Sequence, residues 1–490
     1  MSRAALAVLA LACVTGALLR MDHCTAAVEN GGRGINTSWY AGQMVKHFRE
    51  YGFVATGGVP VAQSWPGTLQ ESVRYVSHPA PMTWLWWLGA SVPAIPEELG
   101  LRLVPLLANL LTLPLCFFAL RRQASALAAA VGTLVWATLP MSAYYGSIPS
   151  GEALLLPWLL LLWVLHARWR AGVGSAALLA TVFGLGCCID WAFYWAAPAL
   201  GVAALLQGSF RAQFKLLLTL LLSGVAAFGL YVLHMSLVAG GFEQFTQQLQ
   251  SALGVERAVQ ADLVGFLEAQ WSFLRALYGV PALALLALGL LAVSTQRGRR
   301  FAPFAAFGAT VALLHVGLFH RHAFDHDFWS IPLCLCVAMA GAALVDVVLE
   351  RHRLAVAMLV ALAVALPGAF ATHALTRARS TAAFRDEVAA LPRLHDENTV
   401  ALVAPFWIQQ VFYARAHVFP TVDTVEKAQA MAATYARVYA QTAKRPALMA
   451  LTPVGETQNA ELQRLRGWYA SLGIQPQIYG AFEVWYLPGG

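Results

Sequence analysis

Ionisable residues lie where long apolar segments of this sequence begin or end. Glu152 opens one such segment shortly after Tyr145, Asp190 separates two others, and the run His320–Asp327 precedes a fourth. A carboxylate at the edge of an apolar segment can orient or deprotonate a hydroxyl or amine, because desolvation raises its pKa and lets it bind a proton. These residues therefore indicate acid–base or binding chemistry at the ends of the apolar segments.

Each candidate carboxylate also has a structural explanation. Glu152 follows Ser150, which would cap a helix whose dipole favours an acid in its first turn. Asp190 suits the polar tip of a tight turn, and Glu29 lies in a long loop, where acids are usually solvated. The sequence leaves these alternatives open, and Glu152, Asp190 and Glu29 are our candidate catalytic residues.

Cations and histidines supply candidates for binding a charged substrate. Arg102 stands near the start of an apolar segment, where a lone cation is costly without a partner. It would either hold a phosphate group or extend to lipid headgroups. Arg74 and Arg321 are further candidates for a phosphate, and His78, which precedes Pro79, is either a substrate-binding or a turn residue.

The run from residue 320 to 327 also permits a metal interpretation. Its three histidines, with Asp325 and Asp327, would in principle satisfy a zinc or manganese ion. The spacing matches no standard metal signature, so an ordinary polar loop is favoured. We assign no metal ligands and no certain cofactor, and a divalent cation stays an open alternative.

Composition identifies a membrane protein. The 490 residues are 59% hydrophobic and 12% charged, against about 25% charged in soluble domains, and the mean hydropathy is +0.61. The net charge of +7 does not indicate nucleic-acid binding, because much of the basic excess lies in short loops between apolar segments. The odd number of cysteines, mostly in apolar stretches, predicts neither a disulfide framework nor a zinc site.

The apolar segments predict a mainly α-helical, polytopic bundle of about eleven spans. The spans are expected near 4–20, 99–120, 124–142, 152–167, 174–189, 191–207, 215–236, 272–293, 301–319, 329–349 and 354–372. Residues 4–19 also resemble a signal peptide, but we favour an uncleaved span. Basic clusters such as Arg121-Arg122 and Arg297–Arg300 occur at every second junction and should be cytoplasmic. We therefore expect a multi-pass protein of the inner (plasma) membrane, with a cytoplasmic N-terminus and the acids and histidines on the outer face.

Two long segments should lie outside the bilayer. The loop 21–98 contains an amphipathic helix, Ser38–Tyr51, expected on the membrane surface, and then a Gly/Pro-rich stretch. The C-terminal segment alternates strands and helices, which predicts a small α/β domain. Its expected elements are strands 399–404 and 447–452, helices 425–442 and 459–472, and a hairpin over 477–487. We thus divide the chain into a transmembrane domain, 1–372, and an extracytoplasmic domain, 373–490.

Several motifs, taken in order, resemble the membrane-bound glycosyltransferases of the C superfamily, in particular the protein mannosyltransferase and aminoarabinose transferase group (family 39). They are the helix ending Lys46-His47-Phe48-Arg49-Glu50-Tyr51-Gly52-Phe53, the segment His78-Pro79-Ala80-Pro81, Gly100-Leu101-Arg102, Tyr144-Tyr145 before Glu152, Asp190-Trp191, and His326-Asp327-Phe328-Trp329. That group usually places an Asp at the start of the first-loop helix as catalytic base. Here the stretch reads Asn36-Thr37-Ser38, and the nearest acids are Asp22 and Glu29.

The resemblance implies an enzyme that moves a hexose or pentose from a polyprenyl-phosphate donor to a lipid, glycan or protein acceptor at the outer face of the membrane. It supports the substrate-binding roles already considered for Arg102 and His78, and it adds such roles for His326, Asp327, Trp191 and Tyr145 beside those considered for Arg74 and Arg321. The expected partners are the lipid-linked donor, membrane lipid and an acceptor that the sequence does not identify. The alternatives are a non-catalytic lipid or polysaccharide transporter, an assembly scaffold, or an inactive transferase homologue.

Overall fold

The computed structural model describes residues 1–24, 37–76, 78–238, 241–243, 245–247, 262–348, 352–379, 391–404, 415–420, 422–455, 459–479 and 482–487. The chain divides into two compact units. The first consists of residues 1–26, 32–35 and 76–378, and the second of residues 27–31, 36–75 and 379–490.

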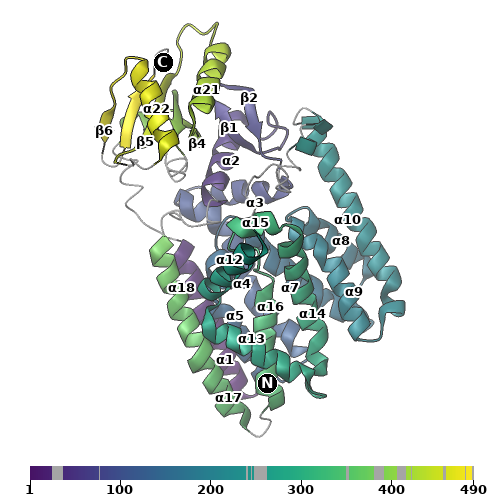
Figure 1. Ribbon diagram of the computed structural model, residues 1–490. Helices are drawn as coiled ribbons and strands as arrows, with labels where there is room; N and C mark the ends of the chain where they lie inside the picture. The colour runs from purple at the N-terminus through teal and green to yellow at the C-terminus, as the bar shows by residue number, and fades with distance from the viewer. Residues whose placement is uncertain are drawn as a thin grey trace. The chain divides into compact units, whose positions relative to one another are not determined.

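The first unit is a bundle of helices (Figure 1). Its elements are α1 (Arg3–Cys24), α3 (Pro81–Ala90), α4 (Glu97–Arg121), α5 (Ala126–Thr138), α6 (Pro140–Tyr145), α7 (Gly151–Arg170), α8 (Ala176–Cys187), η1 (Trp191–Trp195), α9 (Ala196–Leu206), α10 (Phe210–Val238), α12 (Leu263–Leu277), α13 (Gly279–Ser294), η2 (Gly298–Phe301), α14 (Ala302–Leu318), α15 (His320–Asp325), α16 (Leu333–Ala343), η3 (Leu344–Val348), α17 (Arg353–Val360), η5 (Ala361–Ala365) and α18 (Leu366–Arg379).

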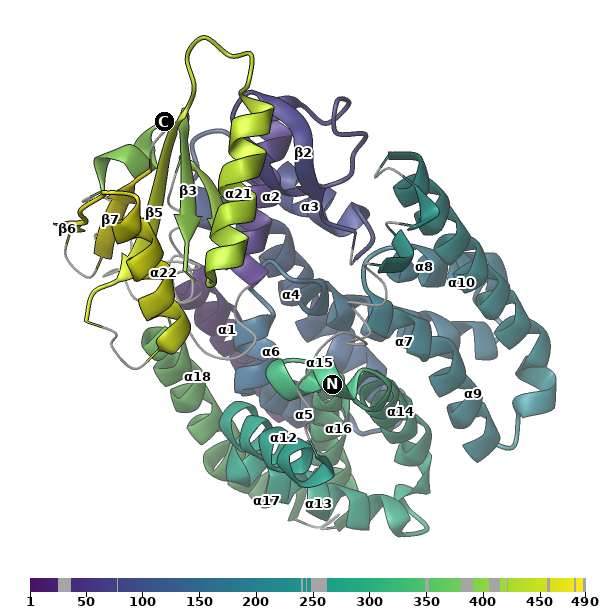
Figure 2. The same cartoon turned by 45° about the horizontal axis from the view of Figure 1, so that its top comes forward.

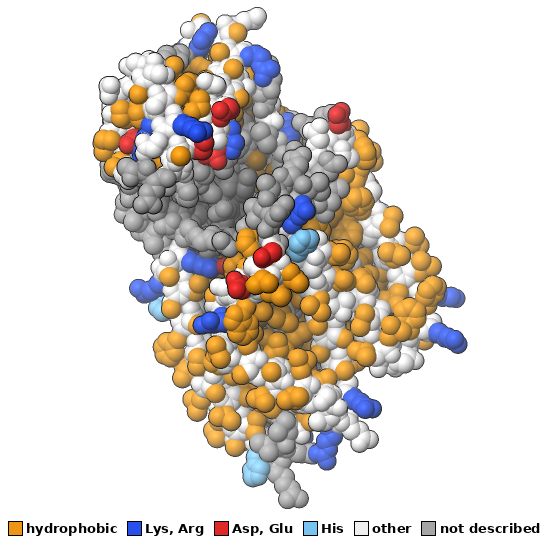
Figure 3. All heavy atoms as spheres, viewed as in Figure 1, with side chains coloured by type: hydrophobic (Ala, Val, Ile, Leu, Met, Phe, Trp, Pro, Cys, Tyr) orange, Lys and Arg blue, Asp and Glu red, His pale blue; other side chains and the backbone are white. Residues whose placement is uncertain are grey.

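Apolar side chains cover much of the surface of these helices (Figure 3). Six described helices are long and apolar enough to cross a bilayer, and a seventh span results if α12 and α13 count as one. Four shorter apolar helices, 126–138, 176–187, 191–206 and 333–347, coincide with further predicted spans. The helical class is confirmed, and the number of eleven spans stays a prediction.

One predicted span has the wrong boundaries. The expected continuous segment 272–293 contains a 102° bend between α12 and α13. Gly279 has a φ of +76°, a left-handed conformation that glycine adopts without steric cost. The hydroxyl of Tyr278 donates to the carbonyl oxygen of Ser330 at 2.7 Å and fixes the corner. Apolar composition continues through the bend, so hydropathy alone did not reveal it.

Asp346 contacts residues from three of the loops that carry basic clusters between apolar helices, here called the basic connections. These contacts lie at one end of the bundle. One carboxylate oxygen accepts from the Arg300 guanidinium at 2.5 Å and from the backbone N–H of Ser125 at 3.0 Å. The other lies 3.5 Å from the Arg353 guanidinium. The side chain of Asp346 is 2% exposed, whereas those of Arg300 and Arg353 are 49% and 33% exposed.

We expect Asp346→Ala to lower the free energy of unfolding by about 1 to 3 kcal/mol, because two cations and a backbone N–H lose their shared acceptor. Thermal unfolding of the purified protein in detergent measures the change. The matched control is Asp423→Ala, which removes an exposed carboxylate paired with Lys427 one helical turn away and should change stability little. Equal effects of the two substitutions would contradict the structural role of Asp346.

The second unit is built on a five-stranded sheet of order β4-β3-β5-β7-β6. Its described elements are α2 (Thr37–Tyr51), β1 (Val61–Trp65), β2 (Thr68–Arg74), η6 (Pro392–His395), β3 (Thr399–Val403), β4 (His417–Pro420), α21 (Val425–Val438), β5 (Ala447–Pro453), α22 (Ala460–Ser471), β6 (Gln477–Tyr479) and β7 (Phe482–Tyr486). Strand β3 runs parallel to β4 and β5, and β7 is antiparallel to β5 and β6. Helices α21 and α22 pack on this sheet through one apolar core (Figure 2).

The expected strands, helices and hairpin of the C-terminal segment are confirmed. Three other strands were not predicted: β4 in this segment, and β1 and β2 in the long loop 21–98. Strand β4 has four residues, too few for a recognisable alternation. Strands β1 and β2 form an antiparallel hairpin inside the Gly/Pro-rich stretch. Trp65 of β1 is 1% exposed and lies 4.5 Å, between ring centroids, from Phe419 of β4. The hairpin therefore packs on the C-terminal sheet.

The predicted amphipathic helix exists as α2, but protein covers its apolar side, and its position on a membrane surface stays a prediction. Met44, Val45 and Phe48 on its apolar side are at most 2% exposed. Protein atoms thus cover these side chains, because α2 packs against β1 within the second unit. Periodicity shows that a helix has an apolar face without showing whether lipid or protein covers it.

Candidate functional site

Glu152 and Asp190 are brought together at one end of the helical bundle. Ser150 caps α7 by accepting from the backbone N–H of Ala153 at 3.2 Å, which places Glu152 in the first turn. Asp190 caps η1 by accepting from the backbone N–H of Ala192 at 2.7 Å. A Cβ atom on Gly151 would lie 2.3 Å from Oδ2 of Asp190, so the start of α7 contacts this carboxylate directly. The glycine allows the two acids to become neighbours.

Capping alone does not explain this acidic pair. Glu152 is 6% exposed and Asp190 is 2% exposed. Burial raises the pKa of Asp190, which lies between two apolar helices, to about 6, while the hydrogen bond from Ala192 opposes this rise. A serine or asparagine would cap η1 without burying a charge beside a second acid. The arrangement is therefore costly for stability, which is typical of functional sites.

A second contact links residues 182 positions apart in the sequence. The hydroxyl of Tyr145, in α6, donates to the carboxylate of Asp327, which precedes α16. Tyr145 is 1% exposed and Asp327 is 4% exposed. Two residues predicted separately as substrate-binding are thus one hydrogen-bonded unit.

Two buried arginines lie at the ends of neighbouring helices. Arg102, in the second turn of α4, is 1% exposed, and its guanidinium lies 3.4 Å from the carbonyl oxygen of Cys24. This burial does not fit the alternative in which Arg102 extends to lipid headgroups. Arg20, near the end of α1, is fully buried and donates to the carbonyl oxygens of Gly16 and Ala137 at 3.0 and 3.1 Å.

Arg20 is a candidate that the sequence did not identify. Its guanidinium also lies 3.4 Å from the carbonyl oxygen of Ser142, and its Nε has no hydrogen-bond partner among the described residues. These three acceptors are neutral carbonyl oxygens, so the charge of Arg20 is available to attract a nearby anion. The sequence does show a single arginine close to the end of the first apolar segment. It does not show that this arginine is buried or which groups surround it.

Most of the other predicted residues of the first unit lie in one of two groups, one of histidines and one of aromatic residues. The rings of His322 and His326 are parallel with centroids 6.0 Å apart, and His78 interacts electrostatically with His322. Burial lowers the pKa of His78 to about 4, so its imidazole is neutral. Trp191 packs edge-on against Tyr231 at 5.2 Å between centroids. Arg321 is exposed on α15.

Two predicted residues are not among the described residues of the first unit. Arg74 belongs to the second unit, where its guanidinium lies 3.4 Å from the carbonyl oxygen of Thr56. Glu29 lies outside the residues that the structure describes. The structure therefore groups Glu152 with Asp190 and Tyr145 with Asp327, and it leaves Glu29 untested.

The metal interpretation of residues 320–327 gains no support from the described side chains, which exclude that of Asp325. Among them, the one group of three potential metal ligands is His47, Glu50 and His417, in the second unit. This group does not include any residue of the run from 320 to 327.

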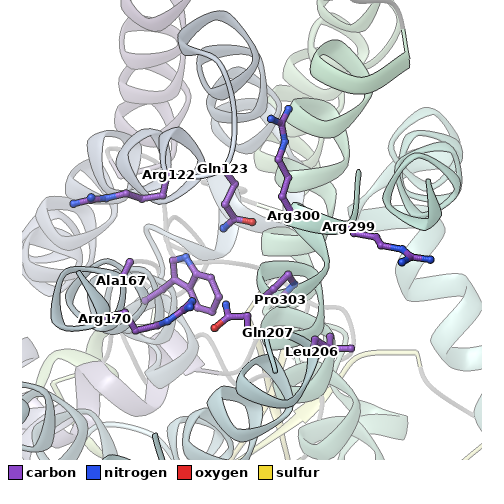
Figure 4. Close-up of a pocket in the computed structure, with 10 residues that line it drawn as sticks. Arg122, Gln123, Ala167, Arg170, Leu206, Gln207, Arg299, Arg300 and Pro303 are labelled. Carbon is purple, nitrogen blue, oxygen red and sulfur yellow. The ribbon is translucent and has the colours of Figure 1, made fainter. Parts of the chain in front are cut away.

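A basic pocket, whose lining residues are drawn in Figure 4, lies toward the C-terminal end of α7, whereas Glu152 lies in the first turn of that helix. It has a volume of about 620 Å³, and Arg122, Arg170, Arg299 and Arg300 are among its lining residues. Trp163 forms one wall. The lining residues from α7 are Trp163, Ala167 and Arg170, so the pocket lies roughly 17 to 27 Å along the helix axis from Glu152. It coincides with the basic connections and does not include the predicted catalytic residues.

Comparisons with known proteins support the fold. No protein-family model matches the chain, and no curated protein matches it by sequence. ArnT from Cupriavidus metallidurans in the apo state is similar in structure, with a TM-score of 0.63, 13% identity, and coverage of 98% of this chain and 97% of ArnT. The same enzyme bound to undecaprenyl phosphate has a TM-score of 0.58, 12% identity and coverage of 99% and 98%.

A second similar structure is the archaeal oligosaccharyltransferase AglB from Archaeoglobus fulgidus, in complex with an inhibitory peptide and a dolichol-phosphate. Its TM-score is 0.55 at 12% identity, and the match covers 91% of this chain and 69% of AglB. Both proteins are membrane glycosyltransferases of the kind that the ordered motifs resemble. The chain therefore has the fold of the C-superfamily membrane glycosyltransferases.

Proposed function

We propose that this chain is a glycosyltransferase that moves a hexose or pentose from a polyprenyl-phosphate donor to an acceptor hydroxyl or amine. The observation that carries the proposal is the buried pair Glu152 and Asp190. Similar structures hold undecaprenyl phosphate and dolichol-phosphate, which supports a lipid-linked donor. Acceptors of three classes, lipid, glycan and protein, fit this chemistry equally.

In the reaction, the acceptor atom forms a bond to the anomeric carbon, the bond from that carbon to the phosphate oxygen breaks, and polyprenyl phosphate leaves with the bonding electrons. The protein must therefore activate the acceptor, neutralise the departing phosphate and position the sugar. Ionised Asp190 accepts the proton of the acceptor or orients it, with Glu152 beside it. Arg102 and Arg20 supply positive charge for the departing phosphate. Tyr145 and Asp327 position the sugar through their hydroxyl and carboxylate oxygens.

The remaining assignments follow from the same proposal. His78, His326 and Trp191 line the substrate site, with Arg321 and Arg74 as weaker contacts and Glu29 as an alternative base. These steps do not require a metal ion, and a divalent cation stays an alternative. We place the protein in the inner membrane with its active site on the outer face, because the basic connections lie at the other end of α7.

The test is incubation of the purified full-length protein with defined undecaprenyl- or dolichyl-phosphate sugars and a mixed set of acceptors. The expected result is release of polyprenyl phosphate, measured by mass spectrometry, together with a glycosylated acceptor. A protein that binds polyprenyl phosphate but releases none from any donor would instead support the transporter, the scaffold or the inactive homologue. Absence of both binding and turnover would refute the proposed substrate class.

A further inference from the structure

His47, Glu50 and His417 converge within the second unit. His47 and Glu50 lie one turn apart on α2, and His417 is the first residue of β4. One ligand atom from each residue lies within 4.8 Å of the others. His47 is 1% exposed and His417 is 2% exposed, while the side chain of Glu50 is 27% exposed. The cluster thus has two buried imidazoles and one carboxylate that reaches solvent.

Backbone carbonyls orient both imidazole rings. Nδ1 of His47 lies 2.7 Å from the carbonyl oxygen of Val61, and Nδ1 of His417 lies 3.1 Å from that of Ser64. With each Nδ1 protonated to donate these bonds, each Nε2 presents a lone pair. A histidine that ligates a metal usually donates its other ring N–H in this way, because the bond fixes the tautomer and the ring orientation.

The lone pair of His47 has no hydrogen-bond partner. Its Nε2 is buried and contacts no donor among the described residues. An ion pair between His417 and Glu50 would account for those two residues but would leave His47 unexplained.

The spacing fits a zinc ion. Nε2 of His417 lies 3.3 Å from Oε1 of Glu50, and two tetrahedral ligands of zinc are about 3.3 Å apart when each bond is about 2.0 Å. The ligand atoms lie within 4.8 Å of one another, so the full set requires His47 to approach by up to about 1.5 Å, which a side-chain rotation can supply. Lys46, which precedes His47 on α2, directs its ammonium to the carbonyl oxygens of Arg415 and Ala416 and so holds the chain before β4 against the helix.

We propose that His47, Glu50 and His417 bind a zinc ion, with water in the fourth position, and that the ion fastens α2 to β4. Two histidines and one glutamate form an established three-ligand set for zinc. The ion would hold the first-loop segment to the C-terminal sheet. This site is independent of the transferase proposal, and neither depends on the other.

The experiment measures zinc in the purified full-length protein after incubation with a zinc salt and removal of the excess, using inductively coupled plasma mass spectrometry. We expect about one zinc per chain, tetrahedral d–d absorption when cobalt replaces zinc, and a zinc-dependent increase in the thermal midpoint. Glu50→Gln and His417→Gln should each weaken zinc binding by about 100-fold or more, because even the loss of a residue that only hydrogen-bonds to a metal ligand costs about 10- to 100-fold.

The matched control is His373→Gln. His373 lies 2.8 Å from the carboxylate of Asp22, so the control removes a histidine from a histidine–carboxylate pair that has no third ligand among the described residues. It should keep about one zinc per chain. Glu50 is partly exposed, so Glu50→Gln should fold even if His417→Gln does not. Equal zinc content in the wild type and in folded Glu50→Gln, or no retained zinc in the wild type, would overturn the proposal.

Discussion

Asp190→Asn is expected to lower the transfer rate by about 100-fold or more and at the same time to stabilise the protein. The amide has the shape of the carboxyl and still caps η1 by accepting from Ala192, but it does not accept a proton from the acceptor. Removing a buried charge beside Glu152 should raise the free energy of unfolding by up to about 3 kcal/mol. Transfer assays and thermal unfolding in detergent measure the two effects.

The stabilisation should depend on pH. The folded-state pKa of Asp190 is about 6, whereas an unfolded aspartate has a pKa of about 3.9. The folded protein therefore binds the proton more tightly, and wild-type stability falls as the pH rises from about 4 to about 6. The advantage of Asp190→Asn should be full above about pH 6 and absent below about pH 4.

Asp262→Asn is the matched control, because Asp262 caps α12 by accepting from Gly265 at 2.7 Å but is exposed. It should alter neither activity nor the pH dependence of stability. Asp190→Ala, which loses the cap, should fall below Asp190→Asn in stability. An Asp190→Asn protein with full activity would remove this residue from the catalytic role and leave Glu152 as the first candidate.

Gly289→Ala is expected to destabilise the helical bundle by about 3 kcal/mol, through forced separation of two helices. A Cβ atom on Gly289, in α13, would lie 2.2 Å from Cβ and 2.5 Å from Cα of Ala340, in α16. Small residues let membrane helices approach closely, and backbone atoms at such a contact do not move aside as a flexible side chain does. Because α16 follows Asp327, displacement of this helix should also reduce transfer.

Gly229→Ala tests whether this effect is specific to the contact. Gly229 is exposed in α10, and a Cβ atom there would meet nothing within 4 Å. Alanine should therefore be neutral or stabilise by up to about 1 kcal/mol through its higher helix propensity. Thermal midpoints and size-exclusion profiles of both variants in detergent are the measurements. A stable, monodisperse Gly289→Ala protein would contradict the close packing of α13 and α16.

The site shows which kinds of inference the linear sequence supports. Glu152 and Asp190 were recognised because a charge at the edge of an apolar segment is unusual anywhere in the chain. Arg20 has the same chemistry, but only the fold shows that it is fully buried and surrounded by carbonyl oxygens. The zinc ligands are 370 positions apart at their extremes, and β4, which carries His417, is too short to be recognised as a strand.

The sequence by itself determined the membrane class, the positions of most apolar helices, the alternation of strands and helices near the C-terminus, and a resemblance to the C-superfamily transferases, whose fold the chain shares. Each depends on local composition or on a period of two to four residues. Only the tertiary structure decided that Asp190 contacts Gly151, that Tyr145 binds Asp327, that α12 and α13 meet at a sharp bend, and that protein covers the apolar side of α2. Such contacts join residues that are distant along the chain, and their geometry depends on how helices and strands pack, which local sequence does not encode.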